Sequence, residues 1–135
     1  MYKNILIPVM LDQSRNTEAS LKAAQALADK GAALTVMHAV VPPPVYVADY
    51  IPMDYIEQQR GDMQTELEKI AATLPNCRTA LVDGSAGRAI AHYAEEHGCD
   101  CVVIASHVPA MSDILLGSTA NYVTRHAACA VLVVR

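Results

Sequence analysis

The stretch Ile104–Ala127, IASHVPAMSDILLGSTANYVTRHA, reads as the end of a buried strand, a proline-containing loop, a glycine-serine turn and a helix. The apolar run Cys101–Ala105 begins the strand, and a second apolar run follows at Ala130–Val134. Two parallel strands need a long crossover between them, which the helix predicted from Ser118 to Ala127 supplies. This end of the chain therefore predicts a β-α-β unit.

The same alternation extends back to the amino terminus. Further strands are predicted at Asn4–Met10, Ala33–Val41 and Arg78–Val82, and further helices at Arg15–Asp29, Asp54–Leu74 and Ala86–His97. Lys30-Gly31 is expected to end the first helix, and Asp12 to Ser14 and Ser85 to cap helix starts. The order predicts one α/β domain over residues 1–135, a doubly wound parallel five-stranded sheet with helices on both faces. Ligands of such sheets bind where the strand order reverses, so the loops after the first and fourth strands are the candidate site.

Three consecutive prolines, Pro42–Pro44, end the second predicted strand, because proline cannot continue a ladder of hydrogen bonds. They open a long connection that contains Tyr46, Tyr50 and Tyr55. The expectation is that these tyrosines pack onto the neighbouring helix. A lid over the ligand site is the alternative.

The charge of the chain limits the kinds of molecule that it is expected to bind. The formal net charge is -4, and no cluster of lysine or arginine is present, which argues against nucleic acid and anionic membrane as main partners. The opening MYKNILIPV resembles neither a signal peptide nor a membrane span, so a cytoplasmic protein is expected. The four cysteines have no zinc-binding spacing and are expected to be small packing residues: Cys77, Cys99, Cys101 and Cys129.

Two short segments offer groups that suit phosphate. Gly117-Ser118-Thr119 precedes a helix, where backbone N–H groups lack intrahelical acceptors and hydroxyls add donors. The plainer alternative is that Ser118 only caps the helix and Gly117 relieves the turn. Ala105-Ser106-His107 ends the fourth strand, where small residues let a ligand approach the backbone and His107 is a candidate donor to phosphate or a structural histidine.

Over its whole length the chain resembles the universal stress protein family. The segments that carry the resemblance are MYKNILIPV, LTVMHAVV, DGSAGRAIAHYAEEHGCDCVVIASH and LLGSTANYVTRHAACAVLVVR. The resemblance implies a Rossmann-like, adenine nucleotide alpha hydrolase-like fold. The pattern ASH-x-P followed by LLGS resembles the F/G-type branch, for which ATP binding, with or without Mg²⁺, is expected.

The sequence departs from the family's ATP-binding loop, which has the form G-x-x-G, nine residues, then G-S or G-T. Ala105 and Val108 stand for the two glycines, and Pro109–Leu116 is one residue shorter than the usual spacer. Met10 stands where the family usually has the aspartate of Pro-x-Asp, an acceptor near the adenine or ribose. The resemblance also implies that Ala39 lies against the adenine, although simple packing explains an alanine there. The expected nucleotide-binding residues are thus Pro8, Val9, Met10, Ala39, Ala105, Ser106, His107, Val108, Gly117, Ser118 and Thr119.

Catalysis receives little support. Phosphoryl transfer needs an oriented water and charge neutralisation, but the loop has no Walker lysine, and its one carboxylate, Asp113, is expected to be a solvated charge. A stress-response or regulatory role with at most slow ATP hydrolysis is expected. The alternatives are an interaction module that has lost nucleotide binding, which Met10 and Val108 favour, and a nucleotide-dependent enzyme on the same fold. The exposed edge of Ala130–Val134, a strand that the family uses for dimerisation, predicts a homodimer.

Overall fold

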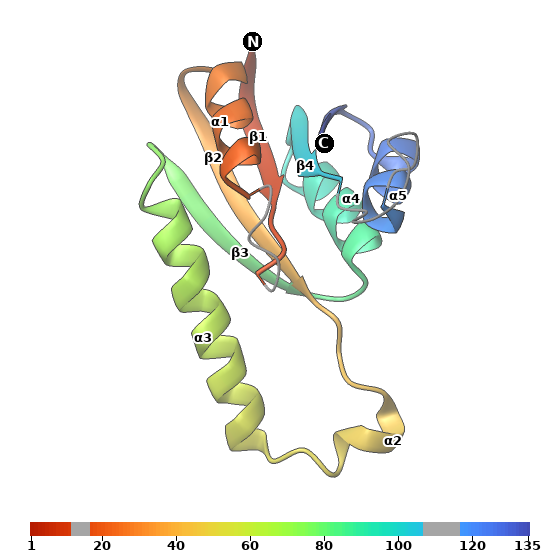
Figure 1. Ribbon diagram of the computed structural model, residues 1–135. Coiled ribbons are helices and arrows are strands. Elements are labelled where there is room, and N and C mark those ends of the chain that lie inside the picture. Colours follow the sequence, from red (N-terminus) through yellow and green to blue (C-terminus); the bar gives the residue numbers. More distant parts are fainter. Residues whose placement is uncertain (12–16, 107–116) are drawn as a thin grey trace.

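The computed structural model describes residues 1–11, 17–106 and 117–135 (Figure 1). The strands in chain order are β1 (Tyr2–Pro8), β2 (Ala28–Val40), β3 (Cys77–Asp83), β4 (Cys101–Ala105) and β5 (Ala130–Val134). The helices are α1 (Thr17–Leu27), α2 (Val45–Ala48), α3 (Met53–Ala71), α4 (Ala86–Glu96) and α5 (Ser118–His126). The bounds of β4 and β5 are those predicted from their apolar runs.

The five strands form one parallel sheet in the order β3-β2-β1-β4-β5. The chain winds outward from β1 through β2 to β3 and then crosses to the other side of β1 to form β4 and β5. The strand order therefore reverses between β1 and β4. This confirms the predicted doubly wound sheet and places its switch point at the carboxyl ends of these two strands.

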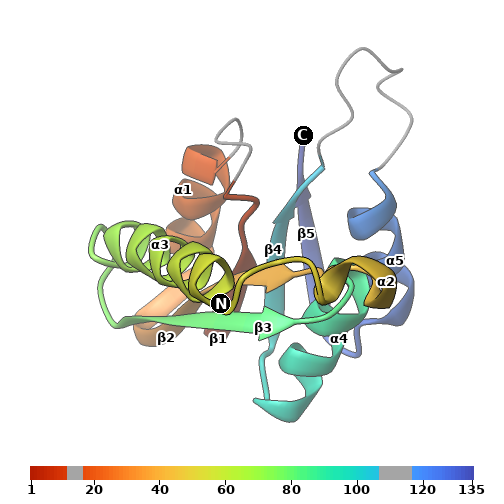
Figure 2. The same ribbon diagram turned by 90° about the horizontal axis from the view of Figure 1, so that it is seen from below.

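Helices cover both faces of the sheet, as Figure 2 shows from below. Side chains alternate along each strand, so Ile5 and Ile7 of β1 face α1 and α3, whereas Leu6 faces α4 and α5. The first face packs on Ala24, Leu67, Ala71 and Leu74, and the second on Ile90, Ala94, Ala120 and Val123. A chain without Phe or Trp fills both layers with aliphatic residues, Met37 and cysteines.

The predicted boundary between the first helix and the second strand is wrong. The helix ends at Leu27, and Ala28 already pairs with Tyr2 at the start of β2. The pairing then skips ahead so that Asn4 lies opposite Ala33, and Gly31 adopts a φ of 78° within this irregular segment. Ala28 and Asp29, which the sequence pattern assigned to the last helical turn, therefore belong to β2 instead.

Helix starts also differ from expectation. Ser85 stands at the N-cap position of α4 and Gly117 at that of α5, but neither makes a side-chain capping hydrogen bond. The predicted cap at Asp12 to Ser14 lies outside the described residues. The predicted helix Asp54–Leu74 runs instead from Met53 to Ala71.

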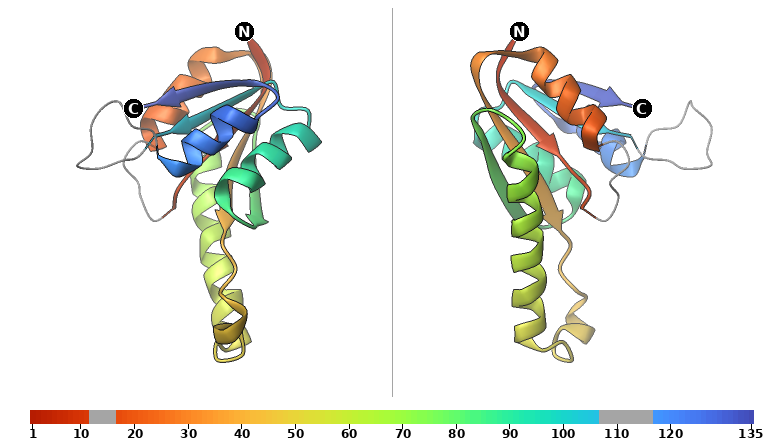
Figure 3. Two further views of the ribbon diagram at one scale, coloured as in Figure 1. Left: turned by 90° about the vertical axis from the view of Figure 1, so that its right-hand side faces the viewer. Right: turned by 60° about the vertical axis from the view of Figure 1, so that its left-hand side comes forward.

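The connection after β2 holds the largest departure. It contains the short helix α2, and its tyrosines do not pack onto the neighbouring helix: Tyr46 is 77% exposed, Tyr50 85% and Tyr55 57%. Figures 1 and 3 show α3 extending beyond the sheet with α2 near its far end. The three rings are thus largely exposed, and Tyr55 belongs to α3 itself.

Gly87 permits the close packing of α4 on α5. A Cβ built on Gly87 would lie 2.8 Å from the Cβ of Tyr122, which is too close for two carbon atoms. The nearest atom belongs to the fixed base of the tyrosine side chain, so no change of rotamer relieves the contact. The two helices approach each other at this point because one of them carries no side chain.

Gly87→Ala is therefore expected to destabilise the protein by about 1–3 kcal/mol, as overpacking does, although Gly→Ala in a helix usually stabilises. Gly61→Ala in α3 is the matched control, because nothing lies within 4 Å of its Cβ position, and it should stabilise by about 0.5–1 kcal/mol. Urea unfolding of both variants measures the difference. An increase in stability for Gly87→Ala would contradict the packing described.

Candidate functional site

The candidate site lies at the carboxyl ends of β1 and β4, which are direct neighbours. Ile5 pairs with Cys101 and Leu6 with Val102, so the chain leaves the sheet at Pro8 and at Ala105 side by side. The last residue of β4, Ala105, is half-buried and pairs with Val134 of β5. A ligand at this edge meets the loops that follow both strands.

Ser106 connects the end of β4 to the start of α5. Its backbone N–H donates to the carbonyl of Val134 at 2.8 Å, and its Oγ accepts a hydrogen bond of 3.3 Å from the N–H of Gly117. Two of the segments singled out in the sequence are thereby brought together although the loop between them is long. Because the Ser106 hydroxyl accepts from Gly117, its own hydrogen remains free to be donated elsewhere.

The start of α5 has the properties of an anion-binding turn. Gly117 is the N-cap residue, and the first bond of the helix runs from the Asn121 N–H to the Gly117 carbonyl. The amides of Ser118 and Thr119 precede that bond and have no hydrogen-bond acceptor within the described part of the chain. Ser118 is exposed and Thr119 half-buried, so both are placed for a ligand at the helix start.

The plainer explanation of this triplet does not hold. Ser118 does not cap the helix, because it is the first helical residue and no side-chain capping bond forms. Nor does Gly117 relieve a strained turn, since its φ of −62° and ψ of 157° are open to any residue. The backbone conformation of residue 117 therefore does not itself require glycine.

The end of β1 forms the other wall of the site. Val9 is buried, its N–H donates to the Met37 carbonyl at 2.8 Å, and its carbonyl lies 3.1 Å from Nδ1 of His38. A carbonyl only accepts, so this contact makes Nδ1 of His38 the donor. The chain is thus fixed as far as Val9, and Met10, at 43% exposed, is the first residue that turns outward.

His38 is a positioning residue that the sequence analysis missed. It lies in β2 within the apolar run ALTVMHAVV, where a polar side chain needs a partner. That interruption was the signal available in the sequence. Ala39, the next residue, is half-buried near the carboxyl end of β2 and pairs with Val82, so the structure is compatible with both of its proposed roles.

Some predicted site residues lie outside the described residues, namely His107, Val108 and the spacer Pro109–Leu116 with Asp113. Of the remaining ones, the structure brings Ser106 to Gly117, Ser118 and Thr119 at the start of α5. Pro8, Val9 and Met10 stand at the end of the adjacent strand β1.

The cysteines are buried or half-buried free thiols, as expected of packing residues. Cys101 faces the α1 side of the sheet and Cys99 the α4 side. Burial raises the pKa of both thiols to about 11, so neither is a reactive thiolate at neutral pH. Among the described residues no group of three His, Cys, Asp or Glu side chains is arranged to hold a metal ion.

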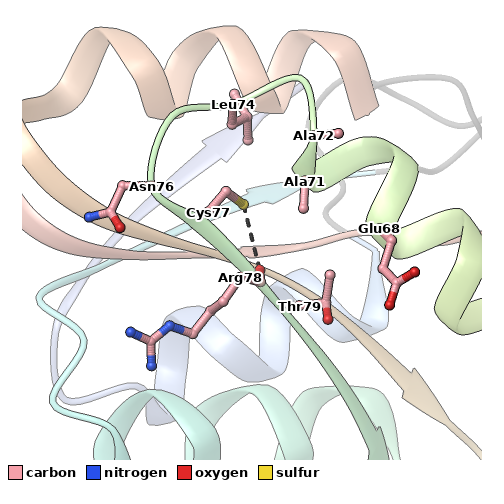
Figure 4. A pocket seen from close by; sticks show the side chains of 8 residues that line it. All are labelled: Glu68, Ala71, Ala72, Leu74, Asn76, Cys77, Arg78 and Thr79. Atoms are coloured by element: carbon pink, nitrogen blue, oxygen red, sulfur yellow. Dashed lines mark hydrogen bonds between the residues drawn. The ribbon is translucent and has the colours of Figure 1, made fainter.

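An open hollow of about 780 Å³ lies elsewhere, between α3 and the amino end of β3 (Figure 4). Its lining includes Glu68 of α3, and Asn76, Arg78 and Thr79 of the β3 segment. It is distant from the switch point, because β3 is the edge strand and its amino end is opposite to the ligand-binding end. The candidate site therefore remains the one at the carboxyl ends of β1 and β4.

A doubly wound sheet with a small-residue turn at its switch point defines an α/β protein of the Rossmann-like class. The chain matches the Universal stress protein family over residues 1–135 and belongs to that family. It is 31% identical over 143 residues to Universal stress protein G of Escherichia coli O157:H7, and the match covers the whole of both chains.

Solved structures show the same fold. The hypothetical protein MJ0577 superposes with a TM-score of 0.83 at 26% identity, covering 99% of this chain and 96% of that one. A universal stress protein in complex with cAMP gives a TM-score of 0.72 at 22% identity, covering 99% and 97%. The Archaeoglobus fulgidus universal stress protein in complex with dAMP gives 0.68 at 18% identity, covering 99% and 98%. In the described residues, no helix is both long and apolar enough to cross a membrane.

Proposed function

We propose that this chain is a cytoplasmic, single-domain universal stress protein that binds an adenine nucleotide, with ATP or its Mg²⁺ complex as the expected ligand. The observation that carries the proposal is the hydrogen bond between Ser106 and Gly117. It holds a hydroxyl donor beside the first turn of α5, where the amides of Ser118 and Thr119 face a phosphate. Family members of the same fold have been solved with cAMP and dAMP, which supports an adenine nucleotide as the ligand class.

The proposed role is regulatory, with at most slow hydrolysis of ATP. The described site residues supply backbone amides, hydroxyls and apolar surface: Pro8, Val9, Met10, Ala39, Ala105, Ser106, Gly117, Ser118 and Thr119. These groups bind and orient phosphates, but they do not neutralise the charge that develops during phosphoryl transfer. The backbone amides therefore favour stable binding over rapid turnover.

Ser106→Ala is expected to weaken ATP binding about tenfold, because one hydroxyl hydrogen bond contributes about 1–1.5 kcal/mol. Thr65→Ala is the control, since Thr65 bonds only to the Gly61 carbonyl on the outside of α3. Calorimetric titration with ATP measures both variants. An equal dissociation constant for Ser106→Ala and the wild type would remove Ser106 from the site.

The binding proposal itself is tested by thermal unfolding of the wild type. A ligand at a hundred times its dissociation constant stabilises by about 2.7 kcal/mol, which raises the melting temperature by several degrees. If millimolar ATP leaves the melting temperature unchanged and no nucleotide copurifies, the second candidate function replaces the first. That candidate is an interaction module without nucleotide, and the exposed methionine at residue 10 favours it.

Met10→Asp is expected to tighten ATP binding by about tenfold or more, because it restores a hydrogen-bond acceptor next to the end of β1. Met53→Asp, an equal change of an exposed methionine on α3, should leave the affinity unaltered. The same titration compares the two. No gain from Met10→Asp would mean that residue 10 does not reach the nucleotide.

We also propose that two copies pair through β5. This strand is one edge of the sheet, and its central residue, Leu132, is 37% exposed. Free N–H and C=O groups along an apolar edge favour pairing with a second chain. In an antiparallel pair that is symmetric about the strand centre, Leu132 of each copy lies opposite Leu132 of the other.

Leu132→Lys should therefore break this pairing, because it places two positive charges opposite each other. Sedimentation at matched concentration measures the change, with Arg135→Lys as a charge-preserving control at the end of the chain. An unchanged mass distribution for Leu132→Lys would show that β5 does not pair.

A further inference from the structure

The segment between β2 and the packed part of α3, residues 41–60, forms an arm with a large apolar surface (Figures 1 and 3). Most of the exposed large hydrophobic side chains among the described residues belong to it: Val41, Val45, Tyr46, Tyr50, Met53 and Tyr55. No residue of α2 is buried, and α3 has none before Leu67. A helix is normally stabilised by burying one face, but this half of α3 has no fully buried residue, and Ile56 and Arg60 are only half-buried.

The arm does not fold back over its own side chains in the structure. Pro42–Pro44 restrict the backbone of the segment that begins the arm. At the other end of the arm, α3 continues without interruption to Leu67 in the core. Arg60 pairs with Asp83 at the end of β3, and Gln64 donates to Thr79 at 2.9 Å. At 1.5 Å per residue, Met53 lies about 20 Å along the helix from Leu67. The arm therefore projects from the sheet, and the contacts of Arg60 and Gln64 hold its base against β3.

The exposed apolar area of the arm is at least as large as the largest patch of a typical monomer and approaches one side of a standard interface. A tyrosine buries about 150–250 Å² when covered, so the three arm tyrosines, at 77%, 85% and 57% exposed, present roughly 300–500 Å² together. Val41, Val45 and Met53 add to this area. A standard interface buries about 800 Å² on each partner, whereas the largest apolar patch of a monomer is about 300–600 Å².

The charge of the arm limits what can cover it. Its ionisable residues other than tyrosine are Asp49, Asp54, Glu57 and Arg60, and the one cation is already paired with Asp83. Nucleic acid and anionic membrane would meet three carboxylates without a free positive charge. The occupant is therefore an apolar protein surface.

We propose that a second copy of this chain covers the arm, so that two arms pack side by side about a twofold axis. An isologous contact needs one self-complementary patch, and a projecting helical arm offers equal ridges and grooves to an identical arm. The tyrosine rings fill the centre of the contact, and their hydroxyls reach solvent at its rim. This interface is separate from β5 and independent of nucleotide binding.

The test uses Leu132→Lys as the background, so that pairing through β5 does not contribute to the measured mass. At about 10–100 µM this variant is expected to sediment at twice the mass of one chain. Adding Tyr46→Ser and Tyr50→Ser should return it to the mass of a single chain, because truncating central tyrosines of an interface weakens binding at least tenfold. Lys22→Ser with Glu95→Ser, exposed on α1 and α4, is the control and should leave the dimer intact.

A background variant that is already monomeric, or a dimer that survives both tyrosine changes, would overturn the proposal. Far-UV circular dichroism checks that each variant is folded. If Leu132→Lys does not fold, the wild type serves instead, since its mass must fall when Tyr46 and Tyr50 are changed. Wild-type protein that is monomeric at these concentrations would equally overturn the proposal.

Salt gives a second, independent readout. Pairing of two acidic arms is opposed by repulsion between their carboxylates, so raising NaCl from about 0.05 to 0.5 M should strengthen the association by screening it. Weakening by salt would indicate ion pairs across the contact and a partner surface unlike the arm. ATP titration of the tyrosine variants should give the wild-type affinity, which separates this interface from the nucleotide site.

Discussion

The junction between β1 and β4 joins the two halves of the sheet, and both the strand order and the position of the site depend on it. Only Ile5–Cys101 and Leu6–Val102 pair there, but side chains reinforce the junction at its amino end. The carboxylate of Asp100 accepts hydrogen bonds from the backbone N–H groups of Lys3 and Asn4 at 2.9 and 3.0 Å. Asn4 in turn donates to the carbonyls of His97 and Gly98. This network fixes the register of β4, and Ser106 at the other end of that strand is positioned as a result.

A small number of hydrogen bonds connects the candidate site to this junction. Ser106 is bonded to Val134 of β5 and to Gly117, the N-cap of α5, so hydrogen bonds join the strand end, the sheet edge and the helix start. The end of β1 is held through Val9 and His38. A site of this construction presents amides and hydroxyls in fixed directions, which suits recognition of a phosphate group. Among the residues of the site that the structure describes, none has a positive φ and none is a buried charge.

The sequence was most informative where secondary structure depends on local composition. The runs CVVIA and AVLVV predicted β4 and β5 to the residue, because continuous runs of branched apolar residues favour strands; β4 is covered on both faces, whereas Ala130 and Leu132 of β5 are exposed. It was least informative where long-range pairing competes with local preference. Ala28 looked like the last turn of a helix and instead pairs with Tyr2, a contact that no local window contains. The hydrogen bond from Gly117 to Ser106 depends likewise on the whole fold, although the two short segments were recognisable on their own.

The arm shows a different limit of reasoning from the sequence. The expectation for Tyr46, Tyr50 and Tyr55 was exposed rings that pack onto the neighbouring helix. The tendency to bury aromatic surface does not specify whether the same chain or a second molecule buries it. In the structure the three prolines, the continuous helix α3 and the Arg60–Asp83 pair hold the rings away from the core. β2 ends at the base of this arm, and Ala39 lies near its carboxyl end, so the proposed assembly surface and the proposed ligand site adjoin the same strand while using different residues.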